Sequence, residues 1–161
     1  MCGDEIFADY VEAVQIDFDP SVLSYAALLD AFFRVHDATV SHRSRQYSSV
    51  IWWHDEAQRK LAASALGEQP RASTTLEAAA PFWAAEPYHQ KWLLQRKRPL
   101  FLSLGMASVD ELIGPSATVL NAVAAGKLPA RVARTRLDAL LKARELAPDA
   151  HGTVVAVLEA F

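Results

Sequence analysis

The chain has 161 residues, of which 52% are hydrophobic and 22% charged, with a formal net charge of −3. This composition is typical of one folded domain with or without an appendage, and it gives no electrostatic support for nucleic-acid binding. No apolar run approaches the roughly 18 residues of a membrane-spanning helix. The single cysteine, Cys2, excludes an intrachain disulfide and a multi-cysteine metal site, so we expect a protein of the reducing cytoplasm.

Residues 10–18 alternate apolar and polar side chains, as a half-buried strand does. Val14, Ile16 and Phe18 share one face of this expected strand. Glu12 has the same parity and is predicted to point with them towards the core. Burial of a carboxyl group raises its pKa towards the range where it can donate a proton. The alternative is that Glu12 lies at the strand end, where the face is already wet.

The next expected element is a helix with Ser24 as its N-cap and an apolar stripe that continues to about His36. A polar loop over 37–45 then leads to a second strand at 46–54. A helix should follow, and its start is marked by a capping box. The residues of this box and the end of the helix are Asp55, Gln58 and Leu66.

A short strand is predicted at 73–78, and a helix should begin after Pro87 with Tyr88, His89 and Gln90 in its first turn. Strands that alternate with helices indicate a two-layer α/β sandwich of the α+β class for residues 1–100. Composition changes beyond that point, and 101–161 are predicted to be a C-terminal helical extension.

The helical extension contains a second capping-box pattern, Ser108 and Glu111, and a helix stop at Gly126. An amphipathic helix should follow Pro129, and a last one should occupy 148–161. The expected apolar positions of the helix after Pro129 are Val132, Leu137, Leu140, Leu141 and Leu146.

Three further side chains are candidates for chemistry, and each has an ordinary structural alternative. Asp37 opens a loop and is typical of a turn or cap residue. Tyr47 begins the second expected strand, where a half-buried ring with its hydroxyl in water is common. His89 is more often a hydrogen-bonded structural residue than a catalyst. No pair of histidines has ligand spacing and no Gly-rich phosphate loop occurs, so we expect neither a metal nor a nucleotide.

Taken together, these stretches resemble methionine sulfoxide reductase A, the peptide-methionine (S)-S-oxide reductase family, in order and spacing over about residues 8–98. The resemblance implies a ferredoxin-like sandwich and no cofactor. The stretches that carry it are Asp9 to Pro20, Ser24 to Leu29, Phe32 to Thr39, Ser44 to Ile51, His54 to Arg59 and Ala85 to Lys91.

In the resembled family a cysteine thiolate attacks the sulfoxide sulfur, which yields a sulfenic acid and methionine. The resemblance implies that Glu12 is the proton donor, Tyr47 a hydrogen-bond donor to the sulfoxide oxygen, and Asp37 a pocket carboxylate. It also implies oxidised-methionine peptides or proteins as substrates. An external thiol, either thioredoxin or dithiothreitol, would be the reductant.

The N-terminal part of the chain departs from the family pattern. Family members carry an apolar strand that ends in Gly-Cys-Phe-Trp well before the glutamate, whereas only 11 residues precede Glu12 here. We therefore expect an N-terminally truncated domain without the family nucleophile, with Cys2 a poor substitute and Val14 and Ile16 exposed. The alternative function is a non-catalytic pseudoenzyme or interaction module that retains the sulfoxide pocket.

Overall fold

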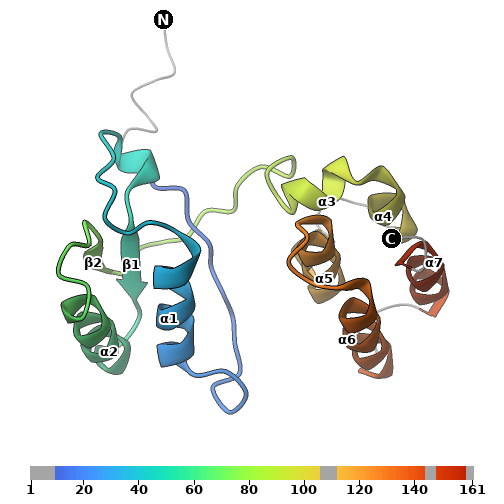
Figure 1. The fold of residues 1–161 in the computed structure, drawn as a ribbon, viewed down its shortest axis with the longest axis horizontal. Helices are drawn as coiled ribbons and strands as arrows, with labels where there is room; N and C mark the ends of the chain where they lie inside the picture. Colours follow the sequence, from blue (N-terminus) through green and yellow to red (C-terminus); the bar gives the residue numbers. More distant parts are fainter. Residues whose placement is uncertain (1–9, 106–111, 144–147, 159–161) are drawn as a thin grey trace, which may run out of the picture. The chain divides into compact units, whose positions relative to one another are not determined.

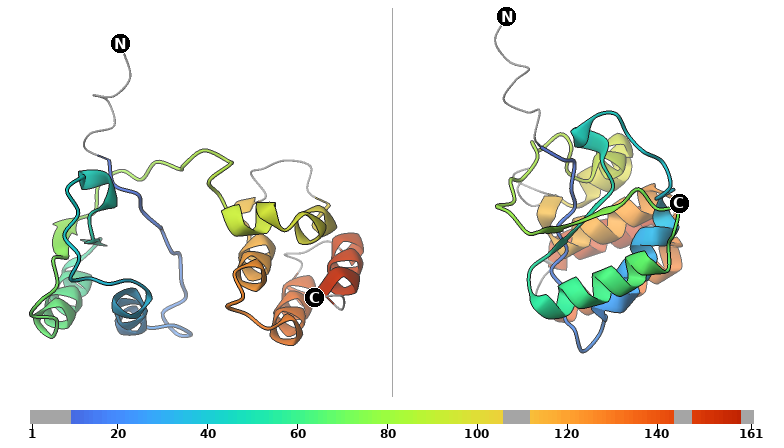
Figure 2. Two further views of the ribbon diagram at one scale, coloured as in Figure 1. Left: turned by 45° about the horizontal axis from the view of Figure 1, so that its top comes forward. Right: turned by 90° about the vertical axis from the view of Figure 1, so that its left-hand side faces the viewer.

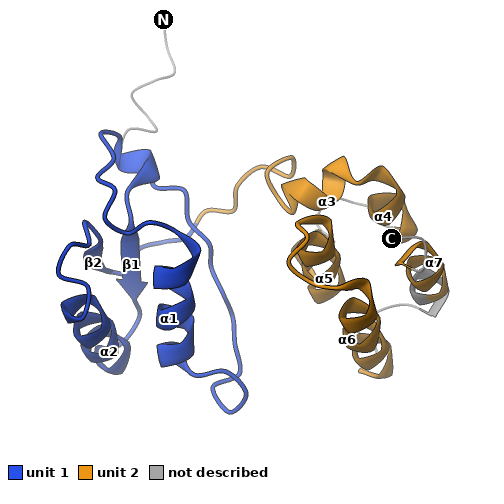
Figure 3. Cartoon of the chain, viewed as in Figure 1, with its two compact units in different colours: residues 1–82 blue, residues 83–161 orange. Residues whose placement is uncertain are grey.

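The structure is a computed structural model that describes residues 10–105, 112–143 and 148–158. The chain divides into two compact units, residues 1–82 and residues 83–161 (Figure 3). The predicted division at residue 100 differs from this one, because the residues from 83 onward fold with the C-terminal helices.

Unit 1 is a small mixed α and β arrangement (Figure 1). Strands β1, Val50–Trp53, and β2, Thr75–Ala78, pair in parallel, with Ile51 opposite Leu76. The connection between them contains helix α2, Glu56–Gly67, as a parallel pair requires. Helix α1, Tyr25–Val35, lies beside α2 (Figure 2). A two-stranded parallel sheet with helices agrees with the predicted α+β class.

The core of unit 1 forms where the two helices cover one face of the sheet. Leu29 of α1, Ile51 of β1 and Ala62 of α2 are buried together, and Leu76 of β2 packs against them. Each of these elements therefore contributes an apolar side chain to one shared layer, which fixes the sheet against the helices.

Both helix starts of unit 1 agree with the sequence signals. The Ser24 hydroxyl accepts from the Ala27 N–H at 3.2 Å, and the Asp55 carboxylate accepts from the Gln58 N–H at 2.8 Å. In the usual capping box the Gln58 side chain would accept from the N–H of the N-cap residue, Asp55. Here its side-chain oxygen accepts instead from the N–H of the preceding residue, His54, at 3.0 Å.

Two predicted strands differ from the structure. Residues 10–18 form no strand, and a backbone hydrogen bond from the Glu12 N–H to the Gln46 carbonyl at 2.9 Å anchors them to another segment. The second expected strand is shorter than 46–54, since a 3₁₀ turn, η1 (Arg45–Tyr47), precedes β1. An alternating pattern becomes a strand only where another strand is placed to pair with it.

Unit 2 is helical. It contains α3 (Trp92–Arg96), α4 (Arg98–Ser103), α5 (Pro115–Ala124), α6 (Ala130–Lys142) and α7 (Pro148–Leu158). All of them contribute to one core, and the Asn121 side-chain oxygen accepts from the Leu94 N–H at 3.0 Å, which ties α5 to α3. The largest fully buried side chains of this core are Leu94, Leu100, Leu112, Leu120, Leu137 and Val154.

Several sequence signals in unit 2 are confirmed. Gly126 adopts φ 67° just after α5, the left-handed conformation that glycine supplies at helix ends, and α6 begins after Pro129.

The helix expected after Pro87 starts later: residues 88–91 form turns, and Lys91 at φ 48° precedes α3. Ser108, Glu111 and Leu146 lie outside the described residues. Over the part of the chain that the structure covers, no helix has the length and apolar character to cross a membrane.

Candidate active site

Glu12 lies on the extended segment 10–19 and is held by Gln46 of η1. The Glu12 N–H donates to the Gln46 carbonyl at 2.9 Å, and Gln46 Nε2 donates to Glu12 Oε1 at 3.0 Å. Two residues that are 34 positions apart in the chain are thus joined through backbone and side chain at once.

The prediction that Glu12 faces an apolar layer is wrong. Its side chain is exposed, and Val14 and Ile16, which share its parity, are 86% and 54% exposed. Because residues 10–18 do not join a sheet, their alternation selects no buried face. The exposure of Val14 and Ile16 confirms the expectation made for these two residues.

Tyr47 is the last residue of η1 and directly follows Gln46. Its side chain is 54% exposed, and its ring centroid lies 6.4 Å from that of His42. The turn therefore places a phenol hydroxyl on the same short segment that holds the Glu12 carboxyl. Glu12 is thus bonded to the residue that precedes Tyr47, and the roles predicted for the two side chains stay predictions.

Arg45, the first residue of η1, forms a two-pronged ion pair with Glu77 of β2. Its Nη1 and Nη2 atoms donate to the two carboxylate oxygens at 2.9 and 2.6 Å, and the Thr75 hydroxyl adds a bond to Oε1 at 2.9 Å. The Arg45 guanidinium holds the pKa of Glu77 below its ordinary value of 4.5. Glu77 is therefore ionised at neutral pH and keeps η1 attached to the sheet.

A second set of hydrogen bonds fixes the residues that follow η1. His36 Nε2 and the Ser49 hydroxyl are 2.9 Å apart, and Ser49 lies 2.8 Å from the Thr74 hydroxyl. The other ring nitrogen of His36 lies 2.8 Å from the Phe32 carbonyl. These bonds connect the end of α1, the start of β1 and the start of β2, so both ends of the 45–49 segment are tied to the sheet.

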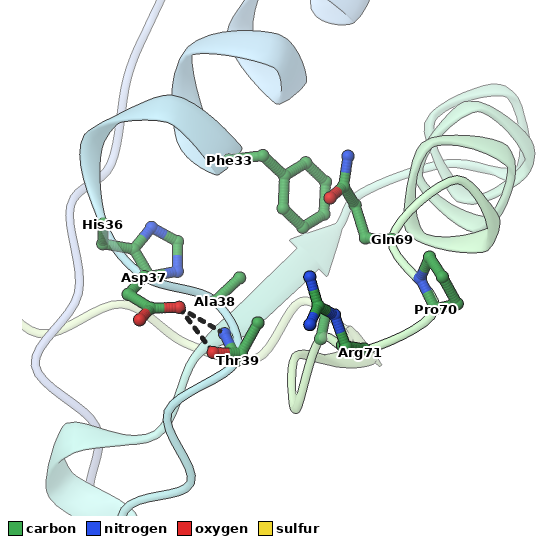
Figure 4. A pocket seen from close by; sticks show the side chains of 9 residues that line it. Phe33, His36, Asp37, Ala38, Thr39, Gln69, Pro70 and Arg71 are labelled. Atoms are coloured by element: carbon green, nitrogen blue, oxygen red, sulfur yellow. Dashed lines mark hydrogen bonds between the residues drawn. The ribbon is translucent and has the colours of Figure 1, made fainter.

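Asp37 lies in a different place, at the rim of a hollow of about 260 Å³ (Figure 4). Glu12 and Tyr47 are not among the residues that line this hollow. Asp37 Oδ1 accepts from the Thr39 N–H at 3.0 Å and from the Thr39 hydroxyl at 2.7 Å. The hollow is lined by Phe33, His36, Asp37, Ala38, Thr39, Gln69, Pro70, Arg71 and Ala72.

The two Thr39 bonds, with a smaller contribution from the neighbouring charges of His36 and Arg71, hold the pKa of Asp37 below its ordinary value of 3.8. A carboxyl group in this state is ionised at neutral pH. Asp37 is therefore suited to accept hydrogen bonds or to face a cation, and it is unsuited to give up a proton.

Replacing Thr39 with valine should raise the pKa of Asp37 towards 3.8, because the hydroxyl bond, the largest cause of the lowering, is lost while the backbone bond stays. Since the folded-state pKa lies below the unfolded one, this bond stabilises the fold above pH 3.8 and is lost as the pH falls below that value. A carboxyl-detected NMR titration measures the change. Asp19, whose pKa is lowered by Ser21 in the same manner, should not move and is the internal control. An unchanged Asp37 would contradict this account.

His89 lies in the turns before α3, where its Nε2 is 3.7 Å from a Glu86 carboxylate oxygen and its ring lies 4.2 Å from that of Tyr88. The 3.7 Å separation is longer than a hydrogen bond, so the two alternatives given for His89 both stay predictions. Within the described ranges, no three His, Cys, Asp or Glu side chains gather as a metal site would require.

A model of the peptide methionine sulfoxide reductase family matches residues 5–111 of the chain. The chain belongs to this family. The match contains Glu12, Asp37 and Tyr47, the three residues for which the sequence predicts roles in the reductase site.

Known reductases show the same relationship. A peptide methionine sulfoxide reductase of Drosophila melanogaster is 38% identical over 125 residues, which cover 73% of this chain and 51% of that protein. MsrA of Nitrobacter winogradskyi is 37% identical over 97 residues, covering 53% and 54%. MsrA of Methanothermobacter thermautotrophicus is 38% identical over 101 residues, covering 55% and 60%. The chain thus spans about half the length of the reductases it matches.

The sequence did not point to the contacts that hold Glu12 and η1 in place, which Arg45, Gln46 and Glu77 make. Gln46 was within a stretch that resembles the family, but its bond to Glu12 depends on the turn at η1. Glu77 is 32 positions from Arg45, and no local pattern in the sequence links the two.

Proposed function

We propose that this chain serves in the reduction of methionine-S-sulfoxide, free or within proteins, to methionine. In this reaction a thiolate attacks the sulfoxide sulfur while Glu12 protonates the oxygen, so that methionine leaves and a sulfenic acid forms. A second thiol then displaces the oxygen as water and leaves a disulfide. External thiols, from thioredoxin or dithiothreitol, return the disulfide to the thiol state.

The observation that carries this proposal is the family match over residues 5–111, together with the bonds that hold Glu12 against η1. Tyr47, one residue beyond Gln46, would donate its hydroxyl to the sulfoxide oxygen as negative charge develops there. Asp37 would act as an ionised acceptor and not as a second acid. We also assign the matched segment to the ferredoxin-like two-layer sandwich, and the protein to a reducing compartment such as the cytoplasm.

The nucleophile requires a separate test, because the only cysteine of the sequence, Cys2, lies outside the described residues. A thiolate is needed at the sulfur, whether it comes from Cys2 or from the reductant itself. The two sources give different outcomes when Cys2 is replaced by serine.

A second candidate function is binding without reduction. Val14 and Ile16 present apolar side chains to solvent on the segment that also carries Glu12. Exposed apolar side chains beside a polar group are common where a polypeptide partner binds. On this alternative, the chain would hold an oxidised methionine or a partner protein and leave the sulfoxide unreduced.

The experiment is a reduction assay with methionine-S-sulfoxide and dithiothreitol, run with the unaltered chain and with Cys2→Ser. Turnover that Cys2→Ser abolishes identifies Cys2 as the nucleophile. Turnover that survives the change means that the added thiol attacks directly. Sulfoxide binding without turnover, weakened by Glu12→Gln, favours the binding function. A chain that shows no binding and no turnover would refute the proposal.

A further inference from the structure

The turn η1 cannot hold its own conformation. It has three residues, and Ser44 before it gives no side-chain cap. A single 3₁₀ turn has few internal hydrogen bonds and poor geometry for them, so contacts from outside the turn must select its conformation. The position of Glu12, which is bonded to the middle residue of η1, depends on those outside contacts.

The contact at the start of the turn is the pair of Arg45 with Glu77. Two parallel N–H···O bonds restrict the guanidinium in distance and in orientation, which a single bond does not do. Glu77 is itself fixed, because it lies in β2 opposite Trp52 of β1 and accepts from the Thr75 hydroxyl. The pair therefore joins η1 to the paired strands of unit 1.

The contact made by the next residue carries this placement to Glu12. Gln46 offers its carbonyl to the Glu12 N–H and its side-chain amide to Glu12 Oε1. The path from the sheet to the acid thus runs through Glu77, Arg45 and Gln46, with a hydrogen bond or a peptide bond at each step.

We propose that the Arg45–Glu77 pair positions the Glu12 carboxyl by holding η1 in place, with Gln46 as the link. Arg45, Gln46 and Glu77 are positioning residues, and none of them exchanges a proton with substrate. The functional meaning of this arrangement rests on the proposed role of Glu12 as proton donor. The arrangement itself can be tested without substrate.

The effect on overall stability should be small. The Arg45 and Glu77 side chains are 39% and 32% exposed, and partly exposed ion pairs contribute little to the free energy of unfolding. A pair of this kind can still determine orientation, because bidentate geometry constrains the turn even where water screens the charges. The test must therefore measure the environment of Glu12 and not the melting temperature alone.

The experiment measures hydrogen exchange of the Glu12 amide by NMR in the full chain. Glu77→Ala should speed this exchange roughly fivefold, the change that corresponds to loss of about one hydrogen bond. Exchange of the α1 amides should stay unchanged. Gln46→Leu keeps the carbonyl that accepts from the Glu12 N–H and removes only the amide bond to Glu12 Oε1, so it should speed Glu12 exchange less than Glu77→Ala does.

The matched control is Glu56→Ala. Glu56 forms a two-pronged pair with Arg59 in the same unit, at 2.7 Å on both prongs, but this pair lies within α2. The control should leave Glu12 exchange unchanged. An unaffected Glu12 amide in Glu77→Ala, or an equal acceleration of the α1 amides, would overturn the proposal.

The same variants separate the positioning from the function. Methionine-S-sulfoxide turnover or binding should fall in Glu77→Ala and in Gln46→Leu, and should stay at the unaltered level in Glu56→Ala. If Glu77→Ala speeds hydrogen exchange of the Glu12 amide but leaves sulfoxide turnover and binding unchanged, the positioning stands and the proton-donor role is refuted. If Glu77→Ala lowers sulfoxide turnover or binding but leaves exchange of the Glu12 amide unchanged, the positioning is refuted and the proton-donor role stands.

Discussion

Replacing Glu12 with glutamine is expected to slow thiol-dependent reduction of methionine-S-sulfoxide by roughly 10²- to 10⁴-fold, the contribution typical of a positioned general acid. Glutamine has the shape of glutamate and keeps an oxygen that can accept from the Gln46 amide, so the placement of residue 12 should survive. On the proposed mechanism, the variant lacks the acidic proton that Glu12 would give to the sulfoxide oxygen. The measurement is the initial rate of methionine formation with dithiothreitol in excess.

Two variants calibrate this result. Asp17→Asn removes another exposed carboxylate from the same segment and should leave the rate unchanged. Tyr47→Phe should slow the reaction about tenfold, because one hydrogen bond to developing charge is removed while the proton donor stays. A Tyr47→Phe variant slower than Glu12→Gln would contradict the assigned roles.

Replacing Leu120 with alanine is expected to lower the free energy of unfolding of the helical unit by about 2–5 kcal/mol. Leu120 is fully buried in α5, within the core to which α3, α4, α6 and α7 also contribute. The deletion leaves a cavity that the surrounding leucines cannot fill without moving. Denaturant unfolding followed by NMR signals from both units measures the loss.

The control for this prediction is Leu102→Ala on α4, where the leucine side chain is 57% exposed. This change should cost less than about 0.5 kcal/mol. Signals from unit 1 should keep their own midpoint in both variants, because Leu29, Ile51 and Ala62 form a separate core. A loss of equal size in Leu102→Ala would show that burial does not govern the stability of this unit.

The parts of the fold that local chemistry determines were predictable from the sequence. Ser24 and Asp55 cap the helices that follow them, and Gly126 ends α5 with a positive φ. Each of these residues acts within a few positions of itself, so a short stretch of sequence contains both the cause and the effect.

The remainder depended on partners distant in the sequence. The alternation at 10–18 predicted a strand, but β1 pairs with β2, and Glu12 is left on an exposed segment. Alternation specifies which side chains could share a face and does not specify whether another strand lies alongside. The candidate site shows the same limit: the family resemblance identified Glu12 and Tyr47, while the Arg45–Glu77 pair could be found only from the structure.

The most direct test of the account is an NMR titration of the ¹⁵N-labelled chain with a short peptide that contains methionine-S-sulfoxide. We expect shifts at the amides of Glu12, Gln46 and Tyr47, and none with the same peptide carrying unoxidised methionine. Shifts confined to the hollow beside Asp37, or equal responses to both peptides, would contradict the claim that the carboxyl held by η1 recognises the sulfoxide oxygen.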